Sequence, residues 1–308
     1  MNLWVSVLIV LVFRISDIES GKLDCEVNPH EVVQPFTIKF YFCSREIEYC
    51  ELVETESMEL NNSSLKSELD TSVKTTILIH GFMRNPEDPW IQKLKSALLD
   101  QEPMNIILVD WSAAYEPGLM ETLIPSLKPF LYTKAVKSIP RVAKKISDFL
   151  QNVSLTIGTP LNQWHKLHFI GHSLGAHTAG RTAKKLKDVV DVARITGLDP
   201  ARPCFESENI WLKLNRTDAK FVDVIHTNSE PGEKVTFGTF EPIGNIDFYP
   251  NGGNNQPGCS EGTGIKKNYV EPTLRQFKPL NYGIASFVNS IHNLWNEPAD
   301  YTDLIEAM

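Results

Sequence analysis

The chain has 308 residues, of which 42% are hydrophobic, and a formal net charge of −8 at pH 7. A chain of this length and composition can bury a large core, which excludes a disordered or fibrous protein. The negative charge argues against a nucleic-acid partner, and against binding to anionic lipid by charge alone.

The N-terminus begins with an apolar run over residues 3–13, which is too short to span a bilayer. A polar stretch with the small residues Ser20 and Gly21 follows it. This pattern predicts a signal peptide over residues 1–20, and therefore a secreted, extracellular protein. No basic residue precedes the run, so an uncleaved membrane anchor is the alternative.

The cysteines bear on the same question, because disulfides form in the secretory pathway. The chain has five: Cys25, Cys43, Cys50, Cys204 and Cys259. An odd number leaves at least one without a partner in the chain, and the close neighbours Cys43 and Cys50 are expected to pair. A secreted protein can also be a glycoprotein, and sequons begin at Asn61, Asn62, Asn152 and Asn215.

After the signal peptide, alternating apolar residues over residues 37–42 predict a strand at an antiparallel edge of a sheet. Short apolar runs predict buried strands over residues 75–79, 105–109, 167–170, 193–198 and 221–225. Helices are predicted from Asp88-Pro89 to residue 99, over residues 132–150 with a bend at Pro140, and after residue 173. Residues 237–259 are expected to be irregular. The alternation predicts an α/β fold, with a mostly parallel central sheet and helices on both faces, in a single domain over residues 21–308.

The segment from Gly171 to His177 reads GHSLGAH and contains G-x-S-x-G between a predicted strand and a predicted helix. A nucleophilic serine must stand at a sharp, strained turn between two such elements. Gly171 and Gly175 flank it because side chains there would collide where strand and helix approach each other. An ordinary turn is the alternative, but the flanking elements favour a nucleophile elbow with Ser173 at its tip.

A serine nucleophile needs a base, and an acid that orients the base. With this type of elbow the acid follows the serine in the chain and the histidine comes last. Asp199 is the best candidate acid, because it stands at the carboxyl end of the next predicted strand, where α/β enzymes place their working residues. The alternative is a carboxylate that only caps the turn before Pro200. Asp110 precedes the serine, and we expect it to be structural.

Five motifs then occur in order: HGF at 80–82, VDW at 109–111, GHSLGAH at 171–177, GLDPA at 197–201 and DAKFVDVIHT at 218–227. Together they resemble the pancreatic lipase family of animal α/β-hydrolases, including its insect secreted lipases and sn-1 phospholipases. The resemblance implies that Ser173 is the nucleophile and Asp199 the acid. It also implies that the backbone amides of Phe82 and Leu174 form the oxyanion hole.

The base is where the sequence departs from the family. Family members place it in a Cys-x-His-x-Arg segment, whose cysteine forms a disulfide with the cysteine of a PGC motif. Here the PGC motif ends at Cys259, no later cysteine occurs, and His292 is the only histidine that follows. Three interpretations stay open: His292 is the base, His226 of the VIHT strand is the base, or the chain end has diverged and no competent base exists.

The resemblance implies a serine carboxylic-ester hydrolase that acts on acyl glycerolipids at an interface, as a triacylglycerol lipase or an sn-1 phospholipase. The alternatives are a catalytically impaired lipid-binding protein, like the family's yolk relatives, and a soluble esterase for small esters. The region around residues 260–291 mixes apolar and basic side chains, and we expect either a lid or an ordinary surface loop there. We expect no C-terminal β-sandwich and hence no colipase-like partner, and the sequence indicates no oligomeric state.

Some relatives bind calcium near the segment matched by residues 213–218. Asp218 is retained here, but Asn215 stands where a second carboxylate would help, and Lys213 is a nearby cation. Calcium prefers several anionic oxygen ligands. We therefore expect no metal and no other cofactor, with calcium at this segment as the alternative.

Overall fold

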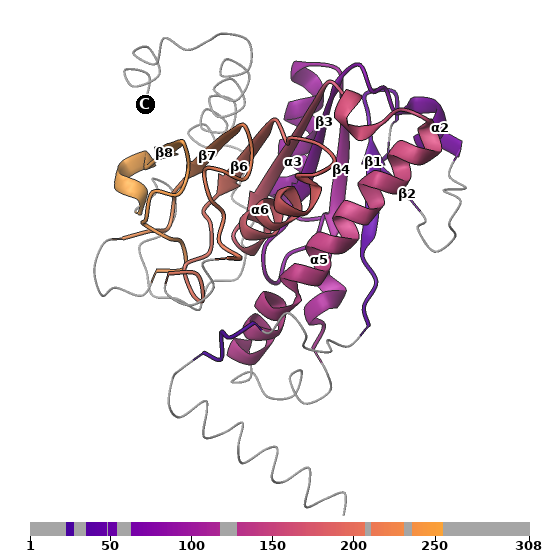
Figure 1. The fold of residues 1–308 in the computed structure, drawn as a ribbon. Helices are drawn as coiled ribbons and strands as arrows, with labels where there is room; N and C mark the ends of the chain where they lie inside the picture. Colours follow the sequence, from indigo (N-terminus) through magenta and orange to yellow (C-terminus); the bar gives the residue numbers. More distant parts are fainter. Residues whose placement is uncertain are drawn as a thin grey trace, which may run out of the picture.

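The computed structural model describes residues 23–27, 35–47, 49–53, 63–117, 128–206, 211–230 and 236–254. They contain an eight-stranded sheet with the order β2-β1-β4-β3-β5-β6-β7-β8 (Figure 1). The strands are β1 (Lys39–Cys43), β2 (Glu51–Val53), β3 (Lys74–Ile79), β4 (Met104–Asp110), β5 (Lys166–His172), β6 (Arg194–Leu198), β7 (Phe221–Ile225) and β8 (Ile246–Phe248). The α-helices are α2 (Ser63–Glu68), α3 (Pro89–Gln101), α5 (Lys128–Ile157) and α6 (Leu174–Leu186).

Most of the sheet is parallel, as the alternation of strands and helices predicts. Strands β3 to β8 all run in one direction, because each neighbouring pair from β4 across to β8 is parallel. Strand β1 is antiparallel to both β4 and β2, which confirms the predicted antiparallel edge. The carboxyl ends of β3, β5 and β6 therefore meet at one edge of the sheet, where α/β enzymes carry their sites.

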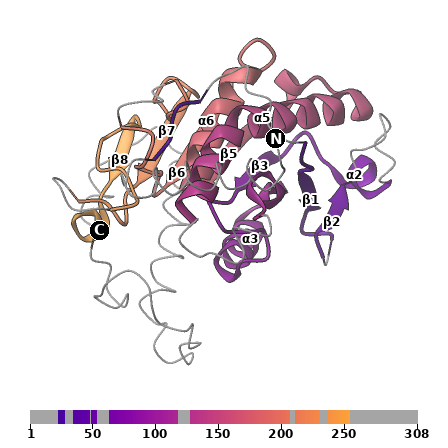
Figure 2. The ribbon, with the colours of Figure 1, turned by 90° about the horizontal axis from the view of Figure 1, so that it is seen from below.

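Helices cover both faces of the sheet. Figure 2 shows α5 and α6 on one side and α3 on the other. The larger apolar core lies under α5 and α6 and includes Ile77, Val109 and Phe169, all buried. The smaller core joins Leu94 and Leu98 of α3 to apolar residues of the sheet's opposite face. The α/β fold class with two covered faces is thus confirmed.

Several predicted boundaries differ from the structure. Helix α5 extends beyond the predicted range at both ends, and Pro140 lies inside it without ending it. Asp88 occupies the N-cap of α3 but makes no side-chain capping hydrogen bond. Residues 237–259 are not wholly irregular, because β8 lies among them.

Two further observations concern the sequence predictions. The Cys43–Cys50 disulfide is present and joins the end of β1 to the start of β2, as predicted. None of the helices in the described ranges is long and apolar enough to cross a membrane. The predicted signal peptide, the predicted lid, Cys259 and His292 lie outside the described residues.

Candidate active site

Ser173 stands between β5 and α6, the strand and helix that the motif requires. Its backbone φ is 54° and its ψ is −118°, a combination that residues other than glycine rarely adopt. Hydrogen bonds hold the turn on both sides: the Ser173 N–H donates to the Leu198 carbonyl over 2.9 Å, and its carbonyl accepts from the Ala176 N–H over 3.1 Å. The residue is half-buried, so the sheet edge holds the strained turn without enclosing it.

The two glycines of the motif are required by close backbone contacts. A Cβ atom at Gly171 would lie 2.3 Å from the Gly175 carbonyl oxygen, so strand and helix touch as predicted. A Cβ atom at Gly175 would lie 2.2 Å from the Ile79 carbonyl oxygen, at the end of β3. Gly175 therefore makes room for a second strand, a contact that the motif alone does not reveal.

The loop after β3 passes directly beside the serine. A Cβ atom at Gly81 would lie 2.9 Å from the Cβ of Ser173. The next residue is Phe82, one of the two predicted oxyanion donors. The other, Leu174, is the first residue of α6, where N–H groups have no acceptor within the helix and the helix dipole is positive. Both predicted donors thus belong to segments that contact the serine.

Asp199 follows β6 directly and has a φ of 45°. Its N–H donates to the Ile225 carbonyl over 2.7 Å. Its Oδ1 accepts the backbone N–H groups of Thr227 and Asn228 over 3.0 and 2.9 Å. A Cβ atom at Gly238 would lie only 2.3 Å from that oxygen, so this glycine leaves space for the carboxylate. The sequence did not indicate this role of Gly238, because its place in a glycine-rich segment was the only pattern around it.

His80 lies between β3 and Phe82, and both of its ring nitrogens make structural contacts. Its Nδ1 lies 2.9 Å from the Gly81 carbonyl oxygen, and its Nε2 lies 3.2 Å from the Trp111 backbone N and 3.5 Å from Asp110. Burial alone would raise the pKa of Asp110, but hydrogen bonds with His80 and Ser112 outweigh burial and lower that pKa to about 2. Asp110 therefore tethers the strand ends, in line with the structural role expected for it.

His172 precedes the serine, but its ring lies 5.1 Å from the ring of Trp90 in α3, on the opposite face of the sheet from α6. Its Nδ1 atom is buried and has no hydrogen-bond partner in the described part of the chain. Burial lowers the pKa of His172, so the ring is mainly neutral at pH 7. The ring is packed against an aromatic side chain and makes no hydrogen bond to Ser173.

His226, the alternative base, is fully buried and has both ring nitrogens occupied. Nδ1 lies 2.6 Å from the Thr239 carbonyl oxygen and Nε2 lies 2.8 Å from Asp247 Oδ1. The ring stacks on Tyr249, with 4.3 Å between the ring centroids. A ring held in this way has no nitrogen to offer a serine hydroxyl, so this alternative is wrong.

No histidine among the described residues hydrogen-bonds the Ser173 hydroxyl. His292 lies outside those residues, and its assignment stays a prediction. The described residues therefore include the candidate nucleophile, the candidate acid and the two predicted oxyanion donors, but no candidate base.

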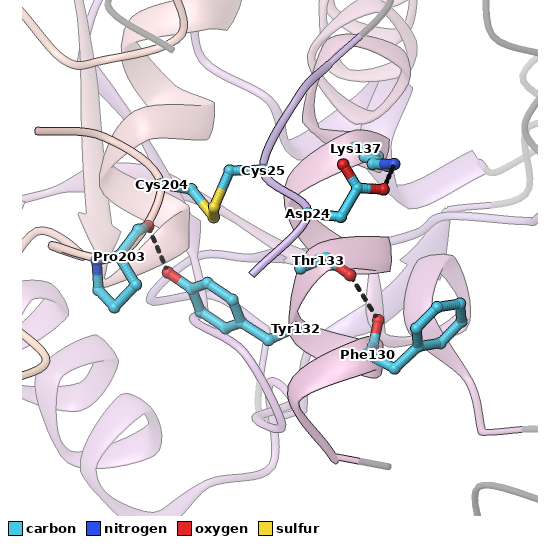
Figure 3. The surroundings of a disulfide bond; sticks show 8 residues. All are labelled: Asp24, Cys25, Phe130, Tyr132, Thr133, Lys137, Pro203 and Cys204. Atoms are coloured by element: carbon cyan, nitrogen blue, oxygen red, sulfur yellow. Dashed lines mark hydrogen bonds and ion pairs between the residues drawn. A yellow bond between two sulfur atoms is a disulfide. The ribbon is translucent and has the colours of Figure 1, made fainter. Parts of the chain in front are cut away.

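A second disulfide, between Cys25 and Cys204, was not predicted. Figure 3 shows it joining the N-terminal segment to the loop that follows Asp199. Next to it, the Tyr132 hydroxyl donates to the Pro203 carbonyl over 3.0 Å, and the Tyr132 ring meets Phe82 edge-on at 5.4 Å. Tyr132 thus links the disulfide-bonded loop to the predicted oxyanion residue. The odd cysteine count was the signal available, but it left the partner of Cys204 open.

A parallel sheet with a strained serine at the elbow and a carboxylate at the next strand end defines an α/β-hydrolase. Residues 26–273 match the Lipase family, and the chain belongs to that family.

The chain is similar to several curated proteins. Pancreatic lipase-related protein 2 of Homo sapiens is 36% identical over 240 residues, which are 78% of this chain and 45% of that protein. Pancreatic triacylglycerol lipase of Sus scrofa is 34% identical over 236 residues, which are 76% of this chain and 47% of that protein. Pancreatic lipase-related protein 2 of Cavia porcellus is 37% identical over 243 residues, or 78% and 50% of the two chains. The chain spans about half the length of these relatives.

Proposed function

We propose that the protein is a secreted serine carboxylic-ester hydrolase that acts on acyl glycerolipids. Ser173 is the nucleophile, Asp199 the acid, His292 the base, and the amides of Phe82 and Leu174 form the oxyanion hole. The observation that carries the proposal is the pair of strained residues at neighbouring strand ends, Ser173 after β5 and Asp199 after β6. Backbone strain of this kind is retained where the surrounding structure enforces it, and it gathers at active sites.

In this mechanism the Ser173 hydroxyl oxygen attacks the ester carbonyl carbon while the histidine takes its proton. The carbonyl electron pair moves to the oxygen, which the two amides stabilise by about 3 kcal/mol or more per donor. The histidine then protonates the departing alcohol, which leaves an acyl-serine. Water attacks that ester by the same steps and releases the fatty acid. Asp199 keeps the imidazole oriented and stabilises its cationic form.

An apolar substrate is supported by two exposed apolar side chains on segments that border the site. Met83 is 55% exposed and lies two residues after Gly81, which borders the serine. Phe237 is 67% exposed and precedes Gly238, which borders Asp199. Ligand pockets are lined mainly by apolar side chains, so exposed apolar residues on the segments that border the serine and the acid suit an acyl chain. The similar proteins named as triacylglycerol lipase and lipase-related protein support the same substrate class.

Secretion is supported by the apolar N-terminal run and by two disulfides in the described chain, because such bonds persist in oxidising compartments. We expect to find the protein in the medium of expressing eukaryotic cells. Mass spectrometry should show that the secreted chain begins at Gly21. Recovery of only membrane-bound protein that still carries residues 1–20 would instead support the uncleaved anchor.

The hydrolase proposal is tested with a fluorophosphonate probe, which labels an activated serine. The full chain should be labelled, and Ser173→Ala should not. The unlabelled full chain should release fatty acid from triacylglycerol emulsions or from phosphatidylcholine vesicles, and the preference between them gives the substrate. A folded wild-type protein without labelling would reject the hydrolase and favour a lipid-binding protein on the same fold.

The base is tested separately with His292→Ala. If His292 is the base, labelling falls to the level of Ser173→Ala while the melting temperature stays unchanged. Labelling of His292→Ala at the wild-type rate would remove His292 from the triad without affecting the assignment of Ser173.

A further inference from the structure

One face of the elbow helix α6 fastens the connection between β6 and β7. His177, Arg181 and Lys184 are four and then three residues apart, so they share one helix face. The His177 Nδ1 accepts the Leu214 backbone N–H over 3.1 Å, and burial lowers the pKa of His177 to about 3, which keeps the ring neutral. The Arg181 guanidinium lies 4.8 Å from the centre of the Trp211 ring. Lys184, the third residue of this face, makes an ionic contact with the β6–β7 connection.

The Lys184 ammonium lies between two oxygens of that connection. It donates to the Lys213 carbonyl and to Asp218 Oδ2, each over 3.0 Å. The Asp218 side chain is only 2% exposed, and the same oxygen accepts the Asn215 N–H over 2.9 Å. Burial raises the pKa of Asp218, and Lys184 acts against that effect by stabilising the charged form. The carboxylate and the carbonyl therefore share one cation supplied by the chain itself.

These residues do not fit a calcium ion, which takes six or more oxygen ligands at about 2.3–2.6 Å. A calcium ion bound to both the Lys213 carbonyl oxygen and Asp218 Oδ2 would occupy the position of the Lys184 ammonium. The calcium ion and the ammonium would repel each other strongly in this partly buried site. Asn215 offers no replacement ligand, because its Oδ1 accepts both the N–H and the hydroxyl of Thr217. The described residues also contain no group of three or more His, Cys, Asp or Glu side chains arranged to hold a metal.

The helix is shaped to bring these groups together. A Cβ atom at Gly180 would lie 2.6 Å from Asp218 Oδ2, so only glycine lets the carboxylate approach the helix. The Lys213 side chain pairs with Glu241, and the Lys213 backbone carbonyl accepts the hydrogen bond from Lys184. Two further cations of the described chain, Lys187 and Arg181, interact with Asp218 and also favour its charged form.

We propose that Lys184 is the resident cation of this site, and that its ammonium replaces a divalent metal in fastening the β6–β7 connection to the elbow helix. The folded protein is then independent of calcium. The connection begins at Asp199, so this internal ion pair also steadies the segment that carries the candidate acid. The proposal does not depend on ester hydrolysis, and its tests use stability alone.

The first test measures the thermal unfolding of the wild-type chain by circular dichroism, in millimolar calcium chloride and in EDTA. We expect the same melting temperature in both, and no saturable heat of calcium binding by titration calorimetry. A melting temperature that rises with calcium, together with binding heat that Asp218→Asn abolishes, would overturn the proposal. Asp218→Asn is the only variant in this test that must fold, because all other measurements use the wild-type chain.

The second test removes the cation. Lys184→Met keeps the length of the side chain and leaves Asp218 without its partner, so the melting temperature should fall by about 4–8 °C, whereas Lys184→Arg should retain most of it. Lys144→Met is the matched control, because its ion pair with Asp148 is exposed and contributes little. Equal melting temperatures for Lys184→Met and Lys144→Met would overturn the proposal. Failure of Lys184→Met to fold, while Lys184→Arg folds, supports it.

Discussion

Ser173 and Asp199 occupy equivalent positions on neighbouring strands, each one residue beyond the last pair of the β5–β6 ladder. That last pair is His172 and Leu198, and the Ser173 N–H extends the ladder by donating to the Leu198 carbonyl. Both residues then leave their strands with a positive φ, 54° for the serine and 45° for the aspartate. Because both turns start at the same level of the sheet, nucleophile and acid stand at one edge, which supports their assignment to a single catalytic triad.

Replacing the acid by its amide should separate orientation from folding. In Asp199→Asn the remaining Oδ1 can still accept the N–H groups of Thr227 and Asn228, so we expect little change in melting temperature. An amide cannot stabilise the imidazolium or fix its tautomer, and the rate of fluorophosphonate labelling should fall by about 10⁴-fold. Labelling of the folded variant at the wild-type rate would remove Asp199 from the triad.

Gly238→Ala tests the space around the acid. The new Cβ would lie 2.3 Å from Asp199 Oδ1 and should displace the carboxylate, and a displacement of about 1 Å can cost about 100-fold in rate. Gly252→Ala is the comparison, because nothing lies within 4 Å there but its φ of 76° disfavours alanine. We expect the rate of fluorophosphonate labelling to fall more than the melting temperature in Gly238→Ala. In Gly252→Ala only the melting temperature should fall. The reverse pattern would show that Gly238 has no role in placing the acid.

The elbow glycine Gly175 should tolerate no side chain. A Cβ there meets the backbone oxygens of Ile79 and His80 at 2.2 and 2.7 Å, and backbone atoms cannot turn aside as a flexible side chain can. We expect Gly175→Ala to lose about 3 kcal/mol of unfolding free energy, measured by urea denaturation. Gly158→Ala, with a φ of 73° and open space around it, should lose only about 1 kcal/mol. Similar losses in the two variants would contradict the close approach of α6 to β3.

The fold and half of the site could be predicted because their signals are local. A long apolar strand such as β4 and the glycines around Ser173 carry their pattern in consecutive residues. Strands β2 and β8 have three residues each, too few to show a period, and they form because a neighbouring strand offers them an edge.

Long-range contacts explain the rest of what the sequence did not reveal. Cys25 and Cys204 are 179 residues apart, and only the folded chain brings them together. The Lys184–Asp218 pair is likewise a contact between a helix and a distant loop, which composition near Asp218 could not indicate. By contrast, the Cys43–Cys50 pair was predictable because both residues flank one short turn.

Asp110 should contribute to the free energy of unfolding at neutral pH, and this contribution should be lost in acid. Its pKa is lowered from 3.8 to about 2 in the folded chain, so it favours the folded state when ionised. The contribution, about 1–2 kcal/mol, is fully present above pH 4 and is lost as the pH falls from about 4 to about 2. The difference in melting temperature between wild type and Asp110→Asn should therefore shrink over that interval. A constant difference between pH 5 and pH 2 would show that the carboxylate charge contributes nothing.

The two disulfides should contribute unequally to stability. Cys25–Cys204 closes a loop over a separation of 179 residues, and Cys43–Cys50 one of only 7. By loop-closure entropy the long bond is worth about 5 kcal/mol and the short one about 2 kcal/mol. Replacing each pair by serines and measuring urea unfolding should show the larger loss for the long bond. Equal losses would mean that the contacts of the N-terminal segment, such as the ion pair of Asp24 with Lys137, hold it in place without the disulfide.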